Sequence, residues 1–314
     1  MQVIFHYPAG TDLTQRLYDL AEFGIEVTIV LPEEKVRFTE ILQASEVLWH
    51  VLQPVTEEHI LQAPNLRLIQ KVGIGVDTID INAAKEADIA VCNLPGTNSR
   101  AVAELAVGLM LAVLRKIPVF DGETRRGEGW KWPTVRQSSL GEIGGRIVGL
   151  IGYGAVPRQL APILLGFGAK LVYCDIQSFP DAVGTRLALK KLLAISDIVS
   201  LHLPLTETTQ HIIDRSSIAL MKKGAILINT ARGGLVDQNA LAEALQSGQL
   251  AAAGLDTFST EPVETNNPLL KLDNLVVSPH IAWLTMETFD RSTKILVENC
   301  RRLRAGEDLL HRVA

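Results

Sequence analysis

The sequence predicts an α/β protein with two doubly wound parallel sheets, because three features of the chain agree on that fold class. Short apolar runs, typical of buried strands, alternate with longer stretches of helical periodicity. The alternation occurs in two blocks, and an uninterrupted helical pattern at 99–116 separates them. Because alternating strands and helices favour a parallel sheet covered by helices on both faces, each block predicts one domain.

The two blocks can be followed element by element along the chain. In the first block we expect strands at 3–7, 26–31, 46–51, 66–72 and 89–92, and helices at 12–22, 33–44 and 81–87. In the second block we expect strands near 146–151, 169–174, 197–201, 225–229, 251–255 and 274–278, with a helix at 158–166. A last helix, at about 285–304, is followed by no strand.

Composition excludes several classes of protein. Of the 314 residues, 47% are apolar and 21% charged, which is typical of a soluble globular chain. The net charge of −5 and the lack of long single-sign runs argue against nucleic acid or membrane partners. The N-terminus does not resemble a secretory signal. The three widely spaced cysteines, Cys92, Cys174 and Cys300, indicate reduced thiols of a cytoplasmic protein and neither a disulfide framework nor a metal site.

The start of the second block resembles a dinucleotide-binding unit. Gly152 and Gly154 follow an apolar strand and precede a helix, and Asp175 ends the next strand. Glycines allow a tight turn and a close approach to pyrophosphate at the helix N-terminus, while the acid binds the adenosine ribose. We therefore expect a Rossmann-like unit that binds NAD, with the backbone of Tyr153, Ala155 and Val156 beside the cofactor. Pro157 replaces the third glycine, and we expect it to be tolerated in the first helical turn.

Three residues near the end of the chain indicate the chemistry. Arg232, Glu261 and His280 each come after an apolar, strand-like run. A guanidinium can bind a carboxylate and polarise a carbonyl, and an imidazole held by a carboxylate can transfer a proton near neutral pH. With a hydride donor, this set can interconvert a 2-keto acid and a 2-hydroxy acid.

Through these motifs the chain resembles the D-isomer-specific 2-hydroxyacid dehydrogenases. The resemblance spans nearly the whole length and includes the cofactor unit and the runs at 72–77, 93–98, 102–104, 201–206, 230–234, 256–262 and 278–280. It implies a discontinuous substrate-binding domain, 1–94 plus 284–314, and an NAD-binding domain, 95–283, with a cleft between them. It also implies that Arg232, Glu261 and His280 are catalytic.

The resemblance implies further site residues. The expected substrate contacts are Gly73, Ile74, Gly75 and Asn98, and the bulky Trp283 stands where much of the family has a small residue. Besides the glycine-turn residues and Asp175, the expected cofactor contacts are Thr97, His202, Leu203, Pro204, Thr209, Thr230, Ala231 and Asp256.

The sequence thus predicts an NAD-dependent, D-specific 2-hydroxyacid dehydrogenase that acts on a small acid such as glyoxylate, hydroxypyruvate or pyruvate. We expect a homodimer formed through the helix at 99–116. Two alternatives stay open. Formate or phosphite oxidation is the nearest enzymatic one, although formate enzymes pair their histidine with glutamine where Glu261 stands here. The other is a regulator that senses NAD(H) on the same fold.

Overall fold

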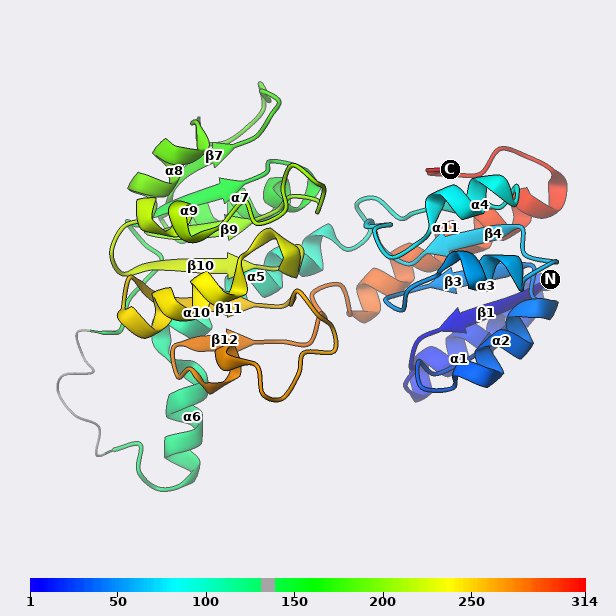
Figure 1. Ribbon diagram of the computed structural model, residues 1–314, viewed down its shortest axis with the longest axis horizontal. Helices are drawn as coiled ribbons and strands as arrows, with labels where there is room; N and C mark the ends of the chain where they lie inside the picture. The colour runs from blue at the N-terminus through cyan, green and yellow to red at the C-terminus, as the bar shows by residue number, and fades with distance from the viewer. Residues whose placement is uncertain (131–138) are drawn as a thin grey trace. The chain divides into compact units, whose positions relative to one another are not determined.

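The computed structural model describes residues 1–130 and 139–314, which form two compact units. We call residues 1–98 together with 285–314 the N-terminal unit, and residues 99–284 the central unit. Each unit is built on a parallel sheet (Figure 1), so the predicted fold class of two parallel-sheet α/β domains is confirmed.

The N-terminal unit has a five-stranded parallel sheet in the order β2-β1-β3-β4-β5. Its strands are β1 (Gln2–His6), β2 (Glu26–Ile29), β3 (Val47–His50), β4 (Leu68–Lys71) and β5 (Ala90–Cys92). Its helices are α1 (Thr11–Asp19), α2 (Lys35–Ala44), α3 (Glu57–Leu61), α4 (Ile81–Glu86) and the last helix α11 (Met286–Ala305), with a 3-10 turn at Leu20–Phe23.

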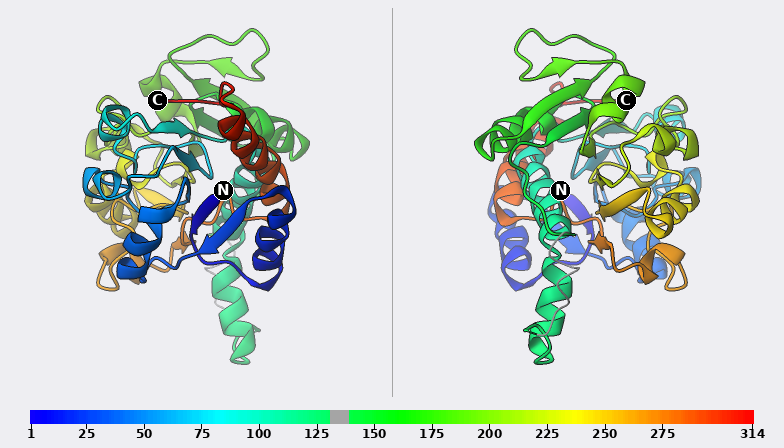
Figure 2. Two further views of the ribbon diagram at one scale, coloured as in Figure 1. Left: turned by 90° about the vertical axis from the view of Figure 1, so that its right-hand side faces the viewer. Right: turned by 90° about the vertical axis from the view of Figure 1, so that its left-hand side faces the viewer.

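Side chains alternate across this sheet and so bury both of its faces. Ile4 packs with residues of α2, α3 and α4 on one face. Its neighbour Phe5 lies on the other face, where its ring centre is 6.5 Å from that of Phe289 in α11. The last helix of the chain therefore packs in the core of the first unit, and Figure 2 shows its ribbon, in orange and red, with the blue strands of this unit.

The central unit has a seven-stranded parallel sheet in the order β12-β11-β10-β9-β6-β7-β8. Its strands are β6 (Ile147–Ile151), β7 (Lys170–Cys174), β8 (Thr185–Arg186), β9 (Ile198–Leu201), β10 (Ala225–Asn229), β11 (Leu250–Leu255) and β12 (Leu275–Val277). Its helices are α5 (Ser99–Arg115), α6 (Ile117–Arg125), α7 (Ala155–Gly166), α8 (Leu189–Ile195), α9 (Arg215–Leu220) and α10 (Gln238–Ser247), with 3-10 turns at Gly233–Leu235 and Pro268–Lys271.

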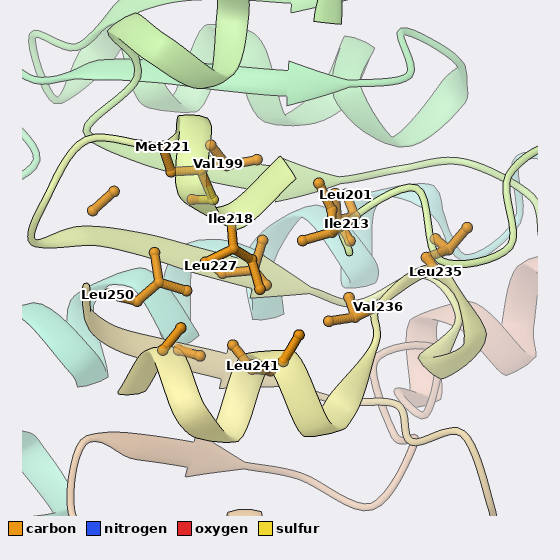
Figure 3. Close-up of a cluster of buried hydrophobic side chains, with 14 of the residues drawn as sticks. Val199, Leu201, Ile213, Ile218, Met221, Leu227, Leu235, Val236, Leu241 and Leu250 are labelled. Carbon is orange, nitrogen blue, oxygen red and sulfur yellow. The ribbon is translucent and has the colours of Figure 1, made fainter. Parts of the chain in front are cut away.

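Two helix layers cover the central sheet. Helices α5 and α7 pack on one face, around residues such as Met110 and Leu160. Helices α8, α9 and α10 pack on the other, where Ile218 and Leu241 meet Leu227 of β10 (Figure 3). A sheet buried on both faces requires nearly continuous apolar strands, which is what the sequence shows. None of the helices in the described part of the chain has the length and apolar character needed to cross a membrane.

Several elements differ from the sequence-based expectation, which gave no ranges for helices α6, α8, α9 and α10. Helix α3 and strand β8 were not predicted, because they contain only five and two residues and are too short to show a periodicity. Helix α7 begins at Ala155, three residues before the expected start at Arg158, because Ala155, Val156 and Pro157 all adopt the first helical turn.

Candidate active site

Three neighbouring strands of the central sheet bring the predicted catalytic residues together. Strands β10, β11 and β12 lie side by side and are parallel, so their carboxyl ends meet at one edge. Arg232 follows β10, Glu261 follows β11, and His280 follows β12. Ligands of open α/β sheets bind at this edge.

His280 and Glu261 form a close pair. The distance between His280 Nδ1 and a Glu261 carboxylate oxygen is 2.6 Å, and the other oxygen accepts a hydrogen bond from the Phe258 amide at 2.9 Å. The side chains are 19% and 33% exposed, so one end of the imidazole is fixed while the pair stays accessible. Because Nδ1 faces a carboxylate, it carries the hydrogen, and Nε2 is left to exchange a proton with a ligand.

The pKa of Glu261 lies below its ordinary value of 4.5. Burial acts in the opposite direction and is the largest single influence. It is outweighed by the hydrogen bond and charge of His280, the Phe258 amide and the charge of Arg232 together. Glu261 is therefore ionised at neutral pH and holds the imidazole as a carboxylate.

Arg232 is positioned by the end of β10. The Asn229 side chain accepts from the Ala231 amide at 3.0 Å and donates to the Arg232 carbonyl at 2.8 Å, which fixes the backbone on both sides. Gly233 follows, and a Cβ there would lie 1.9 Å from the Phe258 carbonyl carbon. Only glycine therefore lets the Arg232 segment pack against the loop that carries Glu261.

Asp256 organises the loop that carries His280. Its fully buried carboxylate accepts hydrogen bonds from the Ser278 hydroxyl at 2.5 Å and from the Ile281 and Ala282 amides at 3.0 and 2.9 Å. Its carbonyl accepts from the His280 amide at 2.8 Å. The predicted contact of Asp256 with the cofactor stays a prediction, and its side-chain partners named here all lie in the His280 loop.

The glycine turn after β6 fits a dinucleotide. Gly152 has φ +92°, and a Cβ there would lie 2.4 Å from the His202 carbonyl oxygen. At Gly154, by contrast, a Cβ would meet no described atom within 4 Å, so space lies open before the N-terminus of α7. Because this helix end presents unpaired amides from Ala155 onward, the turn suits a pyrophosphate.

The adenosine end of the predicted cofactor site is also ordered. One Asp175 carboxylate oxygen accepts from the Tyr153 amide at 2.8 Å and the other from the Gln177 amide at 2.9 Å. The Tyr153 hydroxyl accepts from the Val183 amide at 2.7 Å. Arg186 of β8 donates to the Asp175 carbonyl. Asp175 is thus held at the end of β7, partly exposed, as a ribose-binding acid requires.

The remaining predicted cofactor residues line the same edge. His202, Leu203 and Pro204 follow β9, and the Thr209 hydroxyl donates to the Pro204 carbonyl at 2.7 Å. Burial lowers the pKa of His202 to about 3, so this imidazole is neutral and hydrogen-bonds to Ser200. Ala231 and Thr230 follow β10.

Two buried hydroxyls at this edge support a ligand site. Thr230 Oγ1 after β10 and Thr257 Oγ1 after β11 find no hydrogen-bond partner among the described residues. A buried hydroxyl without a partner is costly, so a polar ligand at the edge would satisfy it. Among residues 1–130 and 139–314, no cluster of three or more acidic, histidine or cysteine side chains could hold a metal ion.

The other predicted substrate and cofactor contacts belong to the N-terminal unit. Gly73, with φ +151°, Ile74 and Gly75 follow β4, and their loop is tied to residues 93–94 by hydrogen bonds from the Leu94 amide and the Asn93 side chain. Thr97 and Asn98 precede α5, and the Thr97 carbonyl accepts from Arg291 of α11. Their substrate and cofactor roles remain predictions.

Trp283 lies in the central unit with its ring nearly buried, at 6% exposure. Its indole N–H donates to the His280 carbonyl at 3.1 Å. The predicted role of this ring as a substrate contact stays a prediction, whereas the bond to the His280 backbone was not foreseen.

Two further polar residues at the sheet edges escaped the sequence-based prediction. Thr257 directly follows the predicted Asp256, and its place at a strand end was the available signal. Lys71 ends β4 with only 6% exposure, and its ammonium donates to the Val51 carbonyl. The signal available in the sequence was a lysine at the end of an apolar strand, since lysines are rarely buried.

Comparisons with known proteins agree with this geometry. Residues 107–282 match the family described as D-isomer specific 2-hydroxyacid dehydrogenase, NAD binding domain. The chain is 40% identical over 294 residues to a hydroxypyruvate reductase of Thermotoga maritima, covering 93% of this chain and 94% of that one. It is 37% identical over 281 residues to a glyoxylate reductase of Korarchaeum cryptofilum, covering 88% and 84%. The solved structure of the TT0316 protein from Thermus thermophilus superposes over all of both chains, with a TM-score of 0.90 and 33% identity.

Proposed function

Because the chain belongs to the D-isomer-specific 2-hydroxyacid dehydrogenase family, it is an NAD-dependent oxidoreductase of 2-keto and 2-hydroxy acids, and we propose that it acts on short, unphosphorylated substrates with D stereospecificity. The observation that supports the 2-keto acid chemistry in this chain is the His280–Glu261 pair beside Arg232 on three adjacent strands. The names of the two relatives, a hydroxypyruvate reductase and a glyoxylate reductase, support a short substrate.

The chain's own residues account for the steps of a reduction. Arg232 binds the substrate carboxylate through its planar fork of donors and polarises the C2 carbonyl. We propose that Gly73, Ile74 and Gly75 are substrate-binding residues through their backbone amides. Bound NADH supplies the hydride that C2 receives. As the C2–O π electrons move to oxygen, His280 transfers its Nε2 proton to that oxygen, and the product is the 2-hydroxy acid.

Glu261 keeps the imidazole oriented and stabilises its protonated form during this cycle. After product release His280 takes a proton from solvent, so each turnover consumes one proton and one hydride. In the oxidative direction His280 removes the hydroxyl proton. Gly152, Gly154, Ala155 and the carboxylate of Asp175 would hold the cofactor at the opposite part of the same sheet edge.

A panel of 2-keto acids tests the proposal. We expect NADH oxidation with glyoxylate or hydroxypyruvate to show the highest kcat/KM, at least about 10-fold above a phosphorylated analogue of hydroxypyruvate. In the reverse direction D-glycerate should be oxidised and L-glycerate should not. Oxidation of formate or phosphite without turnover of any 2-keto acid would contradict the proposal. Tight NADH binding with no turnover at all would favour a sensor of NAD(H).

We also propose that the protein is a homodimer. Helix α6 has no buried residue, and Figure 1 shows it extending from the central unit. On α5, Leu105, Gly108 and Ala112 are less buried than the face that packs on the sheet, so a second copy could cover them. Light scattering during size exclusion should give twice the mass of one chain, and a monomer at micromolar concentration would contradict the proposal.

We propose that the protein is located in the cytoplasm. Cys92, Cys174 and Cys300 are free thiols, as a reducing compartment favours. Burial raises the pKa of Cys92 to about 11 and that of Cys300 to about 12, so these two thiols resist oxidation. Fractionation of cells that produce the protein tests the location, and recovery outside the cytoplasmic fraction would contradict it.

A further inference from the structure

We propose that Trp283 is a positioning residue for His280, which it holds through the hydrogen bond from its indole N–H to the His280 carbonyl. This inference rests on the proposed role of His280 as proton donor. It assigns to the indole a task other than forming a wall of the substrate pocket, and one that phenylalanine could not perform.

The argument starts from the backbone of His280. Its φ is +56°, in the left-handed region that residues other than glycine rarely adopt. Such a conformation persists only where the surroundings determine it, and it is common where a side chain must be aimed. The direction in which the His280 Cβ leaves the chain therefore depends on what holds the backbone at this residue.

Asp256 holds the amide side of that backbone. The His280 amide donates to the Asp256 carbonyl at 2.8 Å, and the next two amides donate to the Asp256 carboxylate at 3.0 and 2.9 Å. The His280 carbonyl is the remaining polar group of this residue's backbone. The bond from Trp283 Nε1, at 3.1 Å, satisfies it and closes a turn of four residues.

Two anchors then define where the reactive nitrogen lies. The imidazole is rigid, so its orientation follows from the position of Cβ and from the position of one ring nitrogen. Glu261 fixes Nδ1 at 2.6 Å, while Asp256 and Trp283 fix the backbone and with it Cβ. The His280 carbonyl and the Ile281 amide belong to one planar peptide, which is held by Trp283 at the carbonyl and by the Asp256 carboxylate at the amide. Loss of the Trp283 bond removes one of these two restraints, so the peptide plane, and with it the position of Nε2 relative to the substrate oxygen, is less precisely fixed. Small misplacements of a catalytic group lower the rate of its own step.

Trp283→Phe is the informative variant, because it keeps an aromatic ring and deletes the N–H. We expect kcat to fall about 3- to 10-fold, the range for one lost hydrogen bond, while the KM for hydroxypyruvate and the Kd for NADH change less than about 2-fold. The solvent deuterium isotope effect on kcat should increase, because proton transfer from His280 becomes slower relative to the other steps.

Trp49→Phe is the matched control. Trp49 is fully buried in β3 of the N-terminal unit, so the same substitution there perturbs packing without touching the His280 loop. We expect it to lower Tm but to leave the solvent isotope effect as in the wild type. If Trp283→Phe behaves in the same way, its role is structural and the proposal is overturned. A raised KM with unchanged kcat would also overturn it, since that result describes a pocket wall.

A measurement without substrate separates this inference from the proposed function. In protein labelled with 15N-tryptophan, the indole signal that disappears in Trp283→Phe belongs to Trp283. We expect its N–H to exchange with solvent at least about 10-fold more slowly than that of Trp130, whose ring is 87% exposed. Slow exchange without turnover of any 2-keto acid would refute the proposed function and retain the bond. Equally rapid exchange would refute the inference, whatever the enzyme reduces.

Discussion

The carboxyl edge of the central sheet carries a histidine paired with a carboxylate, whereas the carboxyl edge of the N-terminal sheet carries two histidines that pack in its core. His6 ends β1 and His50 ends β3. Burial, followed by the charge of His59, lowers the pKa of His6 to about 4. Burial, followed by the charge of Lys71, lowers that of His50 well below its ordinary value.

The difference between the two edges shows what makes a histidine suitable for proton transfer. His50 donates from Nε2 to the Gln53 carbonyl at 2.6 Å, and the His6 ring stacks on Phe38 at 4.0 Å, so both are neutral packing groups at neutral pH. His280 has instead a carboxylate partner and a partly exposed ring. Position at a strand end is common to all three, and the partner distinguishes them.

The largest effect on kcat should come from removing His280, the histidine at the carboxyl edge of the central sheet. His280→Ala should reduce kcat about 100-fold or more, as expected for loss of the proton donor, and should leave NADH binding nearly intact. His6→Phe is the control at the other edge, since it keeps the ring stacked on Phe38 and should leave kcat within about 2-fold. Steady-state kinetics and NADH titration measure both. Equal losses of kcat in the two variants would contradict the distinction between a catalytic histidine at one edge and a packing histidine at the other.

The second largest effect should come from replacing Arg232 at the carboxyl edge of the central sheet. Arg232→Lys keeps the charge but removes the planar fork of donors, so kcat/KM should fall about 10- to 100-fold. Arg125→Lys, in an exposed ion pair with Asp121 on α6, is the matched control and should have wild-type kinetics. Near-normal kinetics for Arg232→Lys would show that a point charge is sufficient and that the assigned geometry is wrong.

Removing the carboxylate partner should make His280 more like the histidines of the other edge. Glu261→Gln should lower kcat about 10-fold, because the imidazolium loses its stabilising charge. Since the folded-state pKa of Glu261 is lowered, its ionised form contributes stability above the unfolded-state pKa and loses it as the pH falls through the folded value.

The pH dependence of that variant therefore has a defined sign. The difference in Tm between wild type and Glu261→Gln should be largest near neutral pH and should shrink as the solution becomes acidic. Thermal unfolding over a series of buffers from neutral to acidic pH measures it, with Glu264→Gln as an exposed control on the same loop. A difference that stays constant over this range would mean that the pair does not stabilise the fold through its charge.

The preference for NADH over NADPH should be of similar size to the effect of Glu261→Gln. The Asp175 carboxylate would repel the 2′-phosphate of NADP, and the residues at 176–178 include no arginine to accept one. We expect kcat/KM to favour NADH over NADPH about 10-fold or more, and Asp175→Ser to narrow the ratio. Arg186, which donates to the Asp175 carbonyl, lies near enough to assist that variant. Equal kcat/KM for the two cofactors in the wild type would contradict the assignment of Asp175.

The same comparison explains which parts of the molecule could be predicted from sequence. Buried parallel strands are long apolar runs, and motifs directly after them must lie at one sheet edge, so Arg232, Glu261 and His280 could be placed together in advance. The pairing of a histidine with a carboxylate across two strands was also predictable, since their residue types and strand ends are both visible in the sequence.

Contacts that depend on the direction of a side chain or of one peptide plane were not predictable. The bonds that Asp256 makes to the His280 loop require the left-handed turn at His280, which no residue type there announces. The bond from Trp283 to a carbonyl follows from that same turn. Trp132 lies outside the described residues.

The smallest effect should come from Pro157, where the dinucleotide fingerprint departs from its usual third glycine. The structure places it in the first turn of α7, behind Gly154, Ala155 and Val156, where amides have no intrahelical partner, so the missing N–H costs little. Its ring is buried in the central unit, on the side of the helix that faces away from solvent.

Pro157→Gly should therefore change the Kd for NADH less than about 3-fold. It should lower the free energy of unfolding by about 1 kcal/mol, because glycine raises the entropy of the unfolded chain and leaves a small void. Isothermal titration with NADH and urea unfolding measure the two quantities. Much tighter NADH binding by Pro157→Gly would contradict this prediction and show that proline obstructs the pyrophosphate site.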